Sequence, residues 1–79
     1  GTMHHLGIDI SKTKFDACLL LESKTLFKTF GNSYDGFESL IAWLTELGVK
    51  SVHACMEGTG RLWIPLAEYL HGRAIAVSV

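Results

Sequence analysis

The sequence has little of several residue types that would point to particular protein classes. It contains one proline in 79 residues, and its seven basic residues are balanced by eight acidic ones, so that the net charge is −1. This balance excludes the basic stripe of a protein that binds nucleic acid through this chain alone. If a longer protein containing this chain binds DNA, we expect most of its phosphate contacts to lie beyond Val79.

The chain also has only two cysteines, and they lack the neighbours of a zinc or redox site. Cys18 and Cys55 belong neither to a CxxC motif nor to a Cys/His set at zinc spacing. Free cysteines are usually buried like small apolar residues. We therefore predict two reduced thiols in the core of a cytosolic protein, with a metal or redox role as the alternative.

No segment is long enough to span a membrane, because every apolar run is far shorter than the roughly 18 residues that a span requires. No secretory signal peptide is visible, and a cytoplasmic location is expected. Gly1 and Thr2 precede Met3 and look like a cloning remnant. Residues 1–5 are therefore predicted to be a disordered N-terminus outside the fold.

Apolar residues, in contrast, are abundant. They make up 48% of the chain and the mean hydropathy is +0.26, although a domain of this size buries only about 60–65% of its unfolded surface. We therefore expect a part of a larger protein, or a module that buries one face by self-association. The C-terminal run AIAVSV favours the first interpretation, because it stops in the middle of a predicted strand.

The N-terminal half has the pattern of a three-stranded antiparallel meander. Residues 6–11, 15–21 and 25–30 are predicted strands, joined by short polar turns. The third strand alternates between two sets of residues, which suits an edge strand with one wetter face. The two sets are Leu26, Lys28 and Phe30 on one face, and Thr25, Phe27 and Thr29 on the other.

The C-terminal half alternates helices and strands. Asp35 and Glu38 have the spacing of a capping box, and apolar residues then recur at helical spacing up to Gly48. Pro65 must lie in the first turn of a second helix, where its missing N–H has no partner to lose. The remaining predicted elements are a strand over residues 51–56, a helix over 61–71 and a strand over 73–79.

The predicted order is therefore β-β-β-α-β-α-β. Each helical crossover requires the two strands that it joins to be parallel, and right-handed crossovers dominate. The meander adds an antiparallel flank. The result is an α/β fold with a mixed five-stranded sheet, in which the first strand lies near the centre and the fourth strand beside it.

Two carboxylates stand out against this apolar background. Asp9 lies between Ile8 and Ile10, where burial of an ionised carboxylate costs several kcal/mol unless a cation or another partner compensates. Glu57 ends the fourth strand, which the topology places beside the first. Two acids on neighbouring strands suggest a site for a hard cation such as Mg²⁺, which binds one or two carboxylates together with waters and phosphates.

Each carboxylate also has a simpler explanation. Asp9 could be satisfied by N–H groups of the following turn or by Lys12 or Lys14, and Glu57 could complement the dipole of the second helix. Asp16 lies one strand away from Asp9. We expect Asp16 to pair with a lysine or to face water, with an extra ligand role as the alternative.

Four short motifs follow one another along the chain, and in this order they resemble a known family. They are GIDISK at residues 7–12 with Phe15-Asp16, then Asn32, Gly36, Phe37, Leu40, Trp43 and Leu44, then MEGTG at residues 56–60, and finally Leu66, Ala67 and Leu70. From Leu6 to Val79 the chain resembles the N-terminal RuvC-like domain of the DEDD-type insertion-sequence transposases, relatives of the Piv invertase. The resemblance implies a ribonuclease H-like fold, truncated after the fifth strand.

The resemblance also implies a prokaryotic, metal-dependent enzyme that cuts and joins DNA strands. In that family four acids, in the order Asp-Glu-Asp-Asp, hold divalent cations, and Asp9 matches the first acid and Glu57 the second. The other two acids, and a C-terminal domain with a serine nucleophile, would lie beyond Val79. We therefore expect two Mg²⁺ or Mn²⁺ ions in the complete site, with Asp9 bridging them, and no activity from this fragment alone.

DNA is the partner that the resemblance implies, bound mainly by regions outside this chain. A guide RNA and a homodimer or higher oligomer are considered as further partners, and a membrane is not. Lys12, Thr59 and Gly60 are candidate contacts to DNA or supports of the site. The simpler accounts are a solvated turn lysine for Lys12 and an N-cap of the second helix for Thr59.

Three alternative functions share parts of this pattern. An ATP-dependent phosphotransferase of the sugar-kinase and actin-like group has the same sheet, but Ser11 and Lys12 stand where its glycines approach phosphate. A RuvC-type junction nuclease has the same fold and metals, with a glycine-bearing turn after the first acid. A non-catalytic interaction module would keep the fold without the metal.

Overall fold

The computed structural model describes residues 3–79 and contains seven elements in the predicted order. No helix within this part of the chain is long and apolar enough to cross a membrane. The elements are β1 (His4–Ile10), β2 (Lys14–Leu20), β3 (Thr25–Gly31), α1 (Tyr34–Glu46), β4 (Val52–Gly58), α2 (Ile64–Gly72) and β5 (Ala76–Ser78).

The strands form one mixed sheet in the order β3-β2-β1-β4-β5. β2 runs antiparallel to β1 and β3, whereas β4 runs parallel to β1 and β5. β1 is therefore the central strand and β4 lies beside it, as predicted. This arrangement confirms the predicted mixed α/β sheet of the ribonuclease H-like type.

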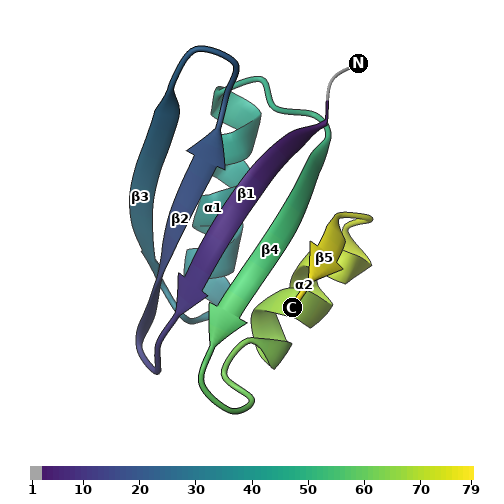
Figure 1. The fold of residues 1–79 in the computed structure, drawn as a ribbon. Coiled ribbons are helices and arrows are strands. Elements are labelled where there is room, and N and C mark those ends of the chain that lie inside the picture. The colour runs from purple at the N-terminus through teal and green to yellow at the C-terminus, as the bar shows by residue number, and fades with distance from the viewer. Residues whose placement is uncertain (1–2) are drawn as a thin grey trace.

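Both helices lie on the same face of the sheet, where α1 contacts β3 and α2 contacts β5 (Figure 1). Strand side chains alternate between the two faces, so every second residue of each central strand points at the helices. In β1 these residues are Leu6, Ile8 and Ile10, all buried. No polar or charged side chain of residues 3–79 is buried, so the core under the helices is entirely apolar.

No helix of the described chain covers the other face of the sheet, which we call the open face (Figure 1). Its residues are the alternate ones, and the pairing of the strands arranges them in rows. They are His5, Gly7 and Asp9 of β1, Asp16, Cys18 and Leu20 of β2, Thr25, Phe27 and Thr29 of β3, His53, Cys55 and Glu57 of β4, and Ala76 and Ser78 of β5.

The start of α1 differs from its prediction. Its N-cap is Ser33, whose Oγ accepts a hydrogen bond from the Gly36 N–H at 3.3 Å, and not Asp35 as the capping-box spacing indicated. Asp35 instead lies in the first turn, where its charge complements the helix dipole. Ser33 and Asp35 are both residue types that often cap helices, so the sequence alone did not show which of them begins α1.

Gly36 allows α1 to begin directly against the end of β3. A Cβ atom at this position would overlap the carbonyl oxygen of Gly31, and would lie 2.7 Å from its carbonyl carbon. The obstacle is backbone and not a flexible side chain, so a larger residue requires the helix or the strand to move. This contact fixes where α1 crosses the sheet.

Other element boundaries were predicted less well. β1 begins at His4, so His4 and His5 belong to the sheet and not to a disordered terminus, because they pair with Val52 and His53 of β4. α2 begins at Ile64, and not at residue 61. β5 spans only Ala76–Ser78, because a turn precedes it. The interpretation of residues 1 and 2 lies outside the described residues.

Candidate metal centre

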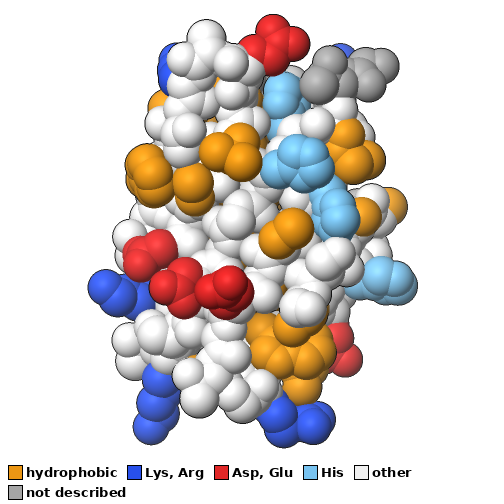
Figure 2. Space-filling model, viewed as in Figure 1, with side chains coloured by type: hydrophobic (Ala, Val, Ile, Leu, Met, Phe, Trp, Pro, Cys, Tyr) orange, Lys and Arg blue, Asp and Glu red, His pale blue; other side chains and the backbone are white. Residues whose placement is uncertain are grey.

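Three carboxylates form a row across the open face. Asp9 pairs in register with Asp16 of β2 on one side and with Glu57 of β4 on the other. All three side chains are exposed, and Figure 2 shows three acidic groups side by side on this face. The predicted adjacency of Asp9 and Glu57 on parallel strands is confirmed. We refer to Asp16, Asp9 and Glu57 together as the acid row.

The prediction that Asp9 is buried was wrong. Ile8 and Ile10 point into the core and are 3% and 4% exposed, and this alternation turns the intervening Asp9 to the open face. The cost of burying a carboxylate therefore does not arise in this chain. The acid still differs from an ordinary surface residue, because it lies on the central strand between two strands that each add another acid.

Asp16 has a partner that the sequence did not indicate. The hydroxyl of Thr29 on β3 donates a hydrogen bond to Asp16 Oδ1 at 2.6 Å, so a threonine and not a lysine holds this carboxylate. Thr29 lies opposite Asp16 because β2 and β3 pair in that register. The sequence placed Thr29 on one face of the third strand together with Thr25 and Phe27, but only the register shows which acid it meets.

The electrostatics of the acid row are unfavourable without a cation. Like charges directly opposite one another on neighbouring strands destabilise a sheet, and Asp9 has a like charge on both sides. Because the row is exposed, water and salt weaken the repulsion. A divalent cation between two of the carboxylates would remove it, so the donor set fits the hard cation that the sequence predicts.

A shallow hollow of about 590 Å³ lies on the open face and includes all three acids of the row in its lining. Its floor includes Gly7, which has no side chain and lies between Cys18 and Cys55 in register.

The prediction of two core thiols was wrong, because Cys18 is half-buried and Cys55 is exposed on the open face. Both follow the alternation of their strands rather than the burial habit of cysteine.

The acid row does not by itself make a complete metal site. Within residues 3–79, no group of three or more His, Cys, Asp or Glu side chains is arranged to hold a metal ion. Asp9 and Glu57 could therefore supply one or two ligands, which is the number of carboxylates that Mg²⁺ usually takes from a protein. The remaining ligands must come from waters, phosphates or other protein segments.

The turn that carries Lys12 is held in place at the carboxyl end of β1. The Ser11 N–H donates to the Lys14 carbonyl at 2.9 Å, and Asn32 Nδ2 donates to the Ser11 carbonyl at 3.1 Å. Lys12 itself is exposed. Asn32 belongs to one of the family motifs, but its support of this turn from the segment that follows β3 was not predicted.

The loop after Glu57 is also ordered by its own contacts. Gly60 has a φ of +60°, a left-handed conformation that favours glycine. Its carbonyl accepts a hydrogen bond from Trp63 Nε1 at 3.1 Å. The simpler account of Thr59, as the N-cap of α2, is wrong, because the helix starts after Trp63 and has no side-chain cap. Both Thr59 and Gly60 are exposed beside the end of β4.

Comparison with known proteins identifies the family of the chain. The transposase family model DEDD_Tnp_IS110 matches residues 6–79, which is nearly the whole described chain. The chain belongs to this DEDD transposase family. The match confirms the resemblance that the ordered motifs indicated.

Two curated relatives are pilin gene-inverting proteins, one from Moraxella bovis and one from Moraxella lacunata. Each is 32% identical to the chain over 77 residues, which is 95% of this chain and 24% of the relative. The chain therefore spans about a quarter of the length of these relatives. Among solved structures, the PPX-GPPA enzyme of Aquifex aeolicus matches 98% of this chain and 35% of its own, with 17% identity and a TM-score of 0.43.

Proposed function

We propose that the chain is the part of a DNA transposase that contributes the first two acids of a metal-dependent strand-cleaving and strand-joining site. Asp9 and Glu57 would be metal ligands in that site. The observation that carries this proposal is their in-register pairing on adjacent parallel strands, on the uncovered face of the sheet, in a chain of the DEDD transposase family.

The chain's own residues support this role through rigidity. Asp9 lies on the central strand, which is hydrogen-bonded on both sides, so its carboxylate is held more firmly than one on a loop would be. Glu57 lies near the end of β4, beside the ordered loop that contains Gly60. Two bound Mg²⁺ or Mn²⁺ ions would stabilise the attacking and leaving oxygens of a phosphodiester.

Asp9 would be the ligand shared by both ions, because its carboxylate is held on the central strand. Glu57 has a longer side chain and lies at the edge of the row, which suits a ligand of one ion or of a bound water. Lys12, Thr59 and Gly60 border the same end of the sheet and are proposed to contact DNA or to support the site. A guide RNA, an oligomer and a cytoplasmic location remain predictions.

The direct test is transposition by the complete gene with Asp9→Asn. We expect activity to disappear while the protein accumulates to its normal level, because the amide keeps the size of the side chain but cannot serve as a charged ligand. Glu22→Gln, which removes the same charge from the turn after β2, should leave transposition unchanged. Retained transposition in Asp9→Asn would contradict the metal assignment.

A further inference from the structure

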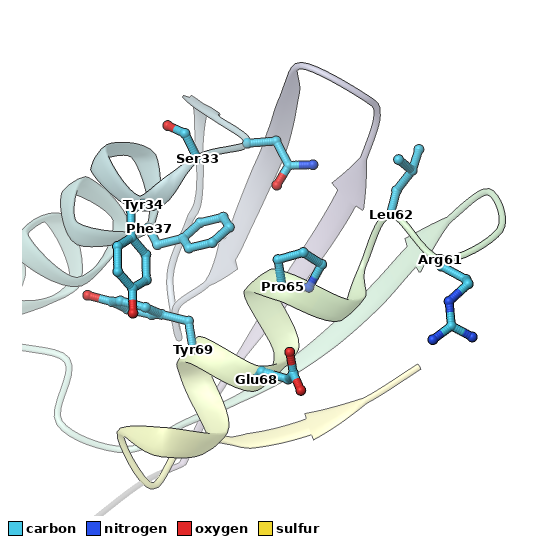
Figure 3. A pocket seen from close by; sticks show the side chains of 9 residues that line it. Ser33, Tyr34, Phe37, Arg61, Leu62, Pro65, Glu68 and Tyr69 are labelled. Carbon is cyan, nitrogen blue, oxygen red and sulfur yellow. The ribbon is translucent and has the colours of Figure 1, made fainter.

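A second hollow lies on the helix-covered face of the sheet, between the first turn of α1 and the length of α2. Its volume is about 610 Å³, within the range of pockets that hold small molecules. Figure 3 shows that Tyr34 and Phe37 approach it from α1, whereas Pro65, Glu68 and Tyr69 approach it from α2. We call this hollow the interhelical groove.

One wall of the groove is aromatic. Tyr34 is 72% exposed, and the centre of its ring lies 5.4 Å from that of Tyr69 and 6.2 Å from that of Phe37. Tyr69 also lines the groove, and its hydroxyl is buried without a hydrogen-bond partner within residues 3–79. The neighbouring rings contact Tyr34 on one side, and most of its surface stays exposed, where another aromatic ring could stack.

Two charged residues of opposite sign lie in the lining. Arg61, in the loop between β4 and α2, borders the groove with an exposed side chain, and Glu68 comes from the exposed side of α2. An arginine binds phosphate through several N–H groups. A carboxylate accepts hydrogen bonds from the amino groups of nucleobases, such as N4 of cytosine. The groove thus combines an aromatic surface for stacking, a hydrogen-bond donor for a phosphate and a hydrogen-bond acceptor for the edge of a base.

The groove opens at the same end of the sheet as the acid row. Arg61 follows Glu57 by one short loop, and β1 and β4 both end at this edge (Figure 1). Lys12 and Lys14 flank the turn after β1 at the same edge, and Figure 2 shows basic groups at the end of the molecule below the acid row. A strand that crosses this edge would meet these cations between the two sites.

We propose that the interhelical groove binds one unpaired base of the nucleic-acid strand whose backbone passes over the carboxyl edge of the sheet. Tyr34 stacks on the base, Arg61 contacts its phosphate, and Glu68 accepts a hydrogen bond from an exocyclic amino group. Glu68 then favours cytosine over thymine, because thymine presents a carbonyl oxygen where cytosine has its amino group. This assignment rests on the proposed function for its partner, a nucleic acid.

The test is a nuclear magnetic resonance titration of the ¹⁵N-labelled chain with dCMP and with dTMP in the presence of EDTA. We expect saturable shifts of backbone amides around Tyr34, Arg61 and Glu68, and tighter binding of dCMP. Shifts spread over lysines at both ends of the sheet, or no saturable shift in the groove, would overturn the proposal.

Matched variants separate stacking from non-specific attraction. Tyr34→Ala should weaken dCMP binding by about five-fold or more, since one stacked base contributes at least this much, whereas Tyr34→Phe keeps the ring and the affinity. Phe27→Ala is the control, because Phe27 is 76% exposed but lies on the open face. Equal losses in Tyr34→Ala and Phe27→Ala would overturn the assignment.

A further variant tests base selection independently of affinity. Glu68→Gln can both donate and accept a hydrogen bond, so the ratio of dCMP to dTMP affinity should approach one. An unchanged ratio would refute the role of Glu68. Because these titrations contain no divalent cation, their failure would leave the metal assignment of Asp9 intact, and loss of that assignment would leave them unaffected.

Discussion

The two faces of the sheet are built from the same strands but differ in nearly every property. The covered face carries the apolar core, which is buried under α1 and α2, and Lys28 of the edge strand β3 is an exposed charge on this side. The open face carries the acid row, both cysteines, His5 and His53, with Phe27 and Leu20 exposed among them. One face supplies the free energy of folding, and the other presents chemical groups in a fixed geometry. A strand with period two can serve both purposes at once.

The largest effect is expected from Gly36→Ala on the covered side. Its Cβ would overlap the Gly31 backbone, so α1 or β3 would have to shift. We expect the cooperative thermal transition to disappear, a loss of roughly 5 kcal/mol or more, comparable to the whole stability of a small domain. Gly72→Ala is the control, since it also lies in a helix but its Cβ would meet nothing within 4 Å. A folded Gly36→Ala chain would refute this contact.

The next effect separates the two faces directly. Leu40 of α1 is fully buried, and Leu20 on the open face is 48% exposed. Leu40→Ala should lower the free energy of unfolding by about 2–5 kcal/mol, and Leu20→Ala by less than about 1 kcal/mol. Urea unfolding at two protein concentrations would measure both. Similar losses at the two positions would mean that another surface covers the open face in solution.

A smaller effect of opposite sign is expected within the acid row. Asp9→Asn removes one of three adjacent like charges, so in EDTA at low ionic strength it should raise the free energy of unfolding, by up to about 1 kcal/mol. Added salt should shrink this gain, and Mg²⁺ should stabilise the unmodified chain more than the variant. Glu22→Gln, outside the row, should show neither effect. A destabilised Asp9→Asn chain would contradict the repulsion.

The smallest effect lies outside both faces, in the connection between α2 and β5. Ala74 has a φ of +61°, a left-handed conformation that costs a residue with a Cβ about 1–2 kcal/mol. Ala74→Gly removes this strain but adds backbone entropy to the unfolded chain. We expect a net stabilisation of about 0.5 kcal/mol in urea unfolding. Ala76→Gly, in a strand, should destabilise the chain instead.

Much of the fold was predictable because periodicity and turn residues are local signals. The seven elements, the central position of β1 and the pairing of Asp9 with Glu57 all follow from order and topology. Boundaries were less predictable, since Ser33 and Asp35 both suit the start of a helix. Residues 51–56 were predicted to form one strand, yet Cys55 was expected in the core and faces outward, because cysteine does not reveal which face it occupies.

The candidate site was only partly predictable for a different reason. The motifs identified Asp9 and Glu57, but the support of Asp16 by Thr29 depends on the register between β2 and β3. The interhelical groove joins Tyr34 to Glu68, residues that no local pattern relates. Contacts of this kind arise from the angle and spacing at which two helices cross the sheet, and a linear sequence does not display either quantity.

The acid row also bears on the fidelity of folding. Asp16, Asp9 and Glu57 each belong to the outward set of their strand. A slip of one residue in the pairing of β2 or β4 would exchange the two sets and turn a carboxylate toward the apolar layer, where an unpaired charge costs several kcal/mol. Mispaired sheets are therefore destabilised on the three central strands by the same carboxylates that mark the candidate site, so these groups help to fix the register of the strands.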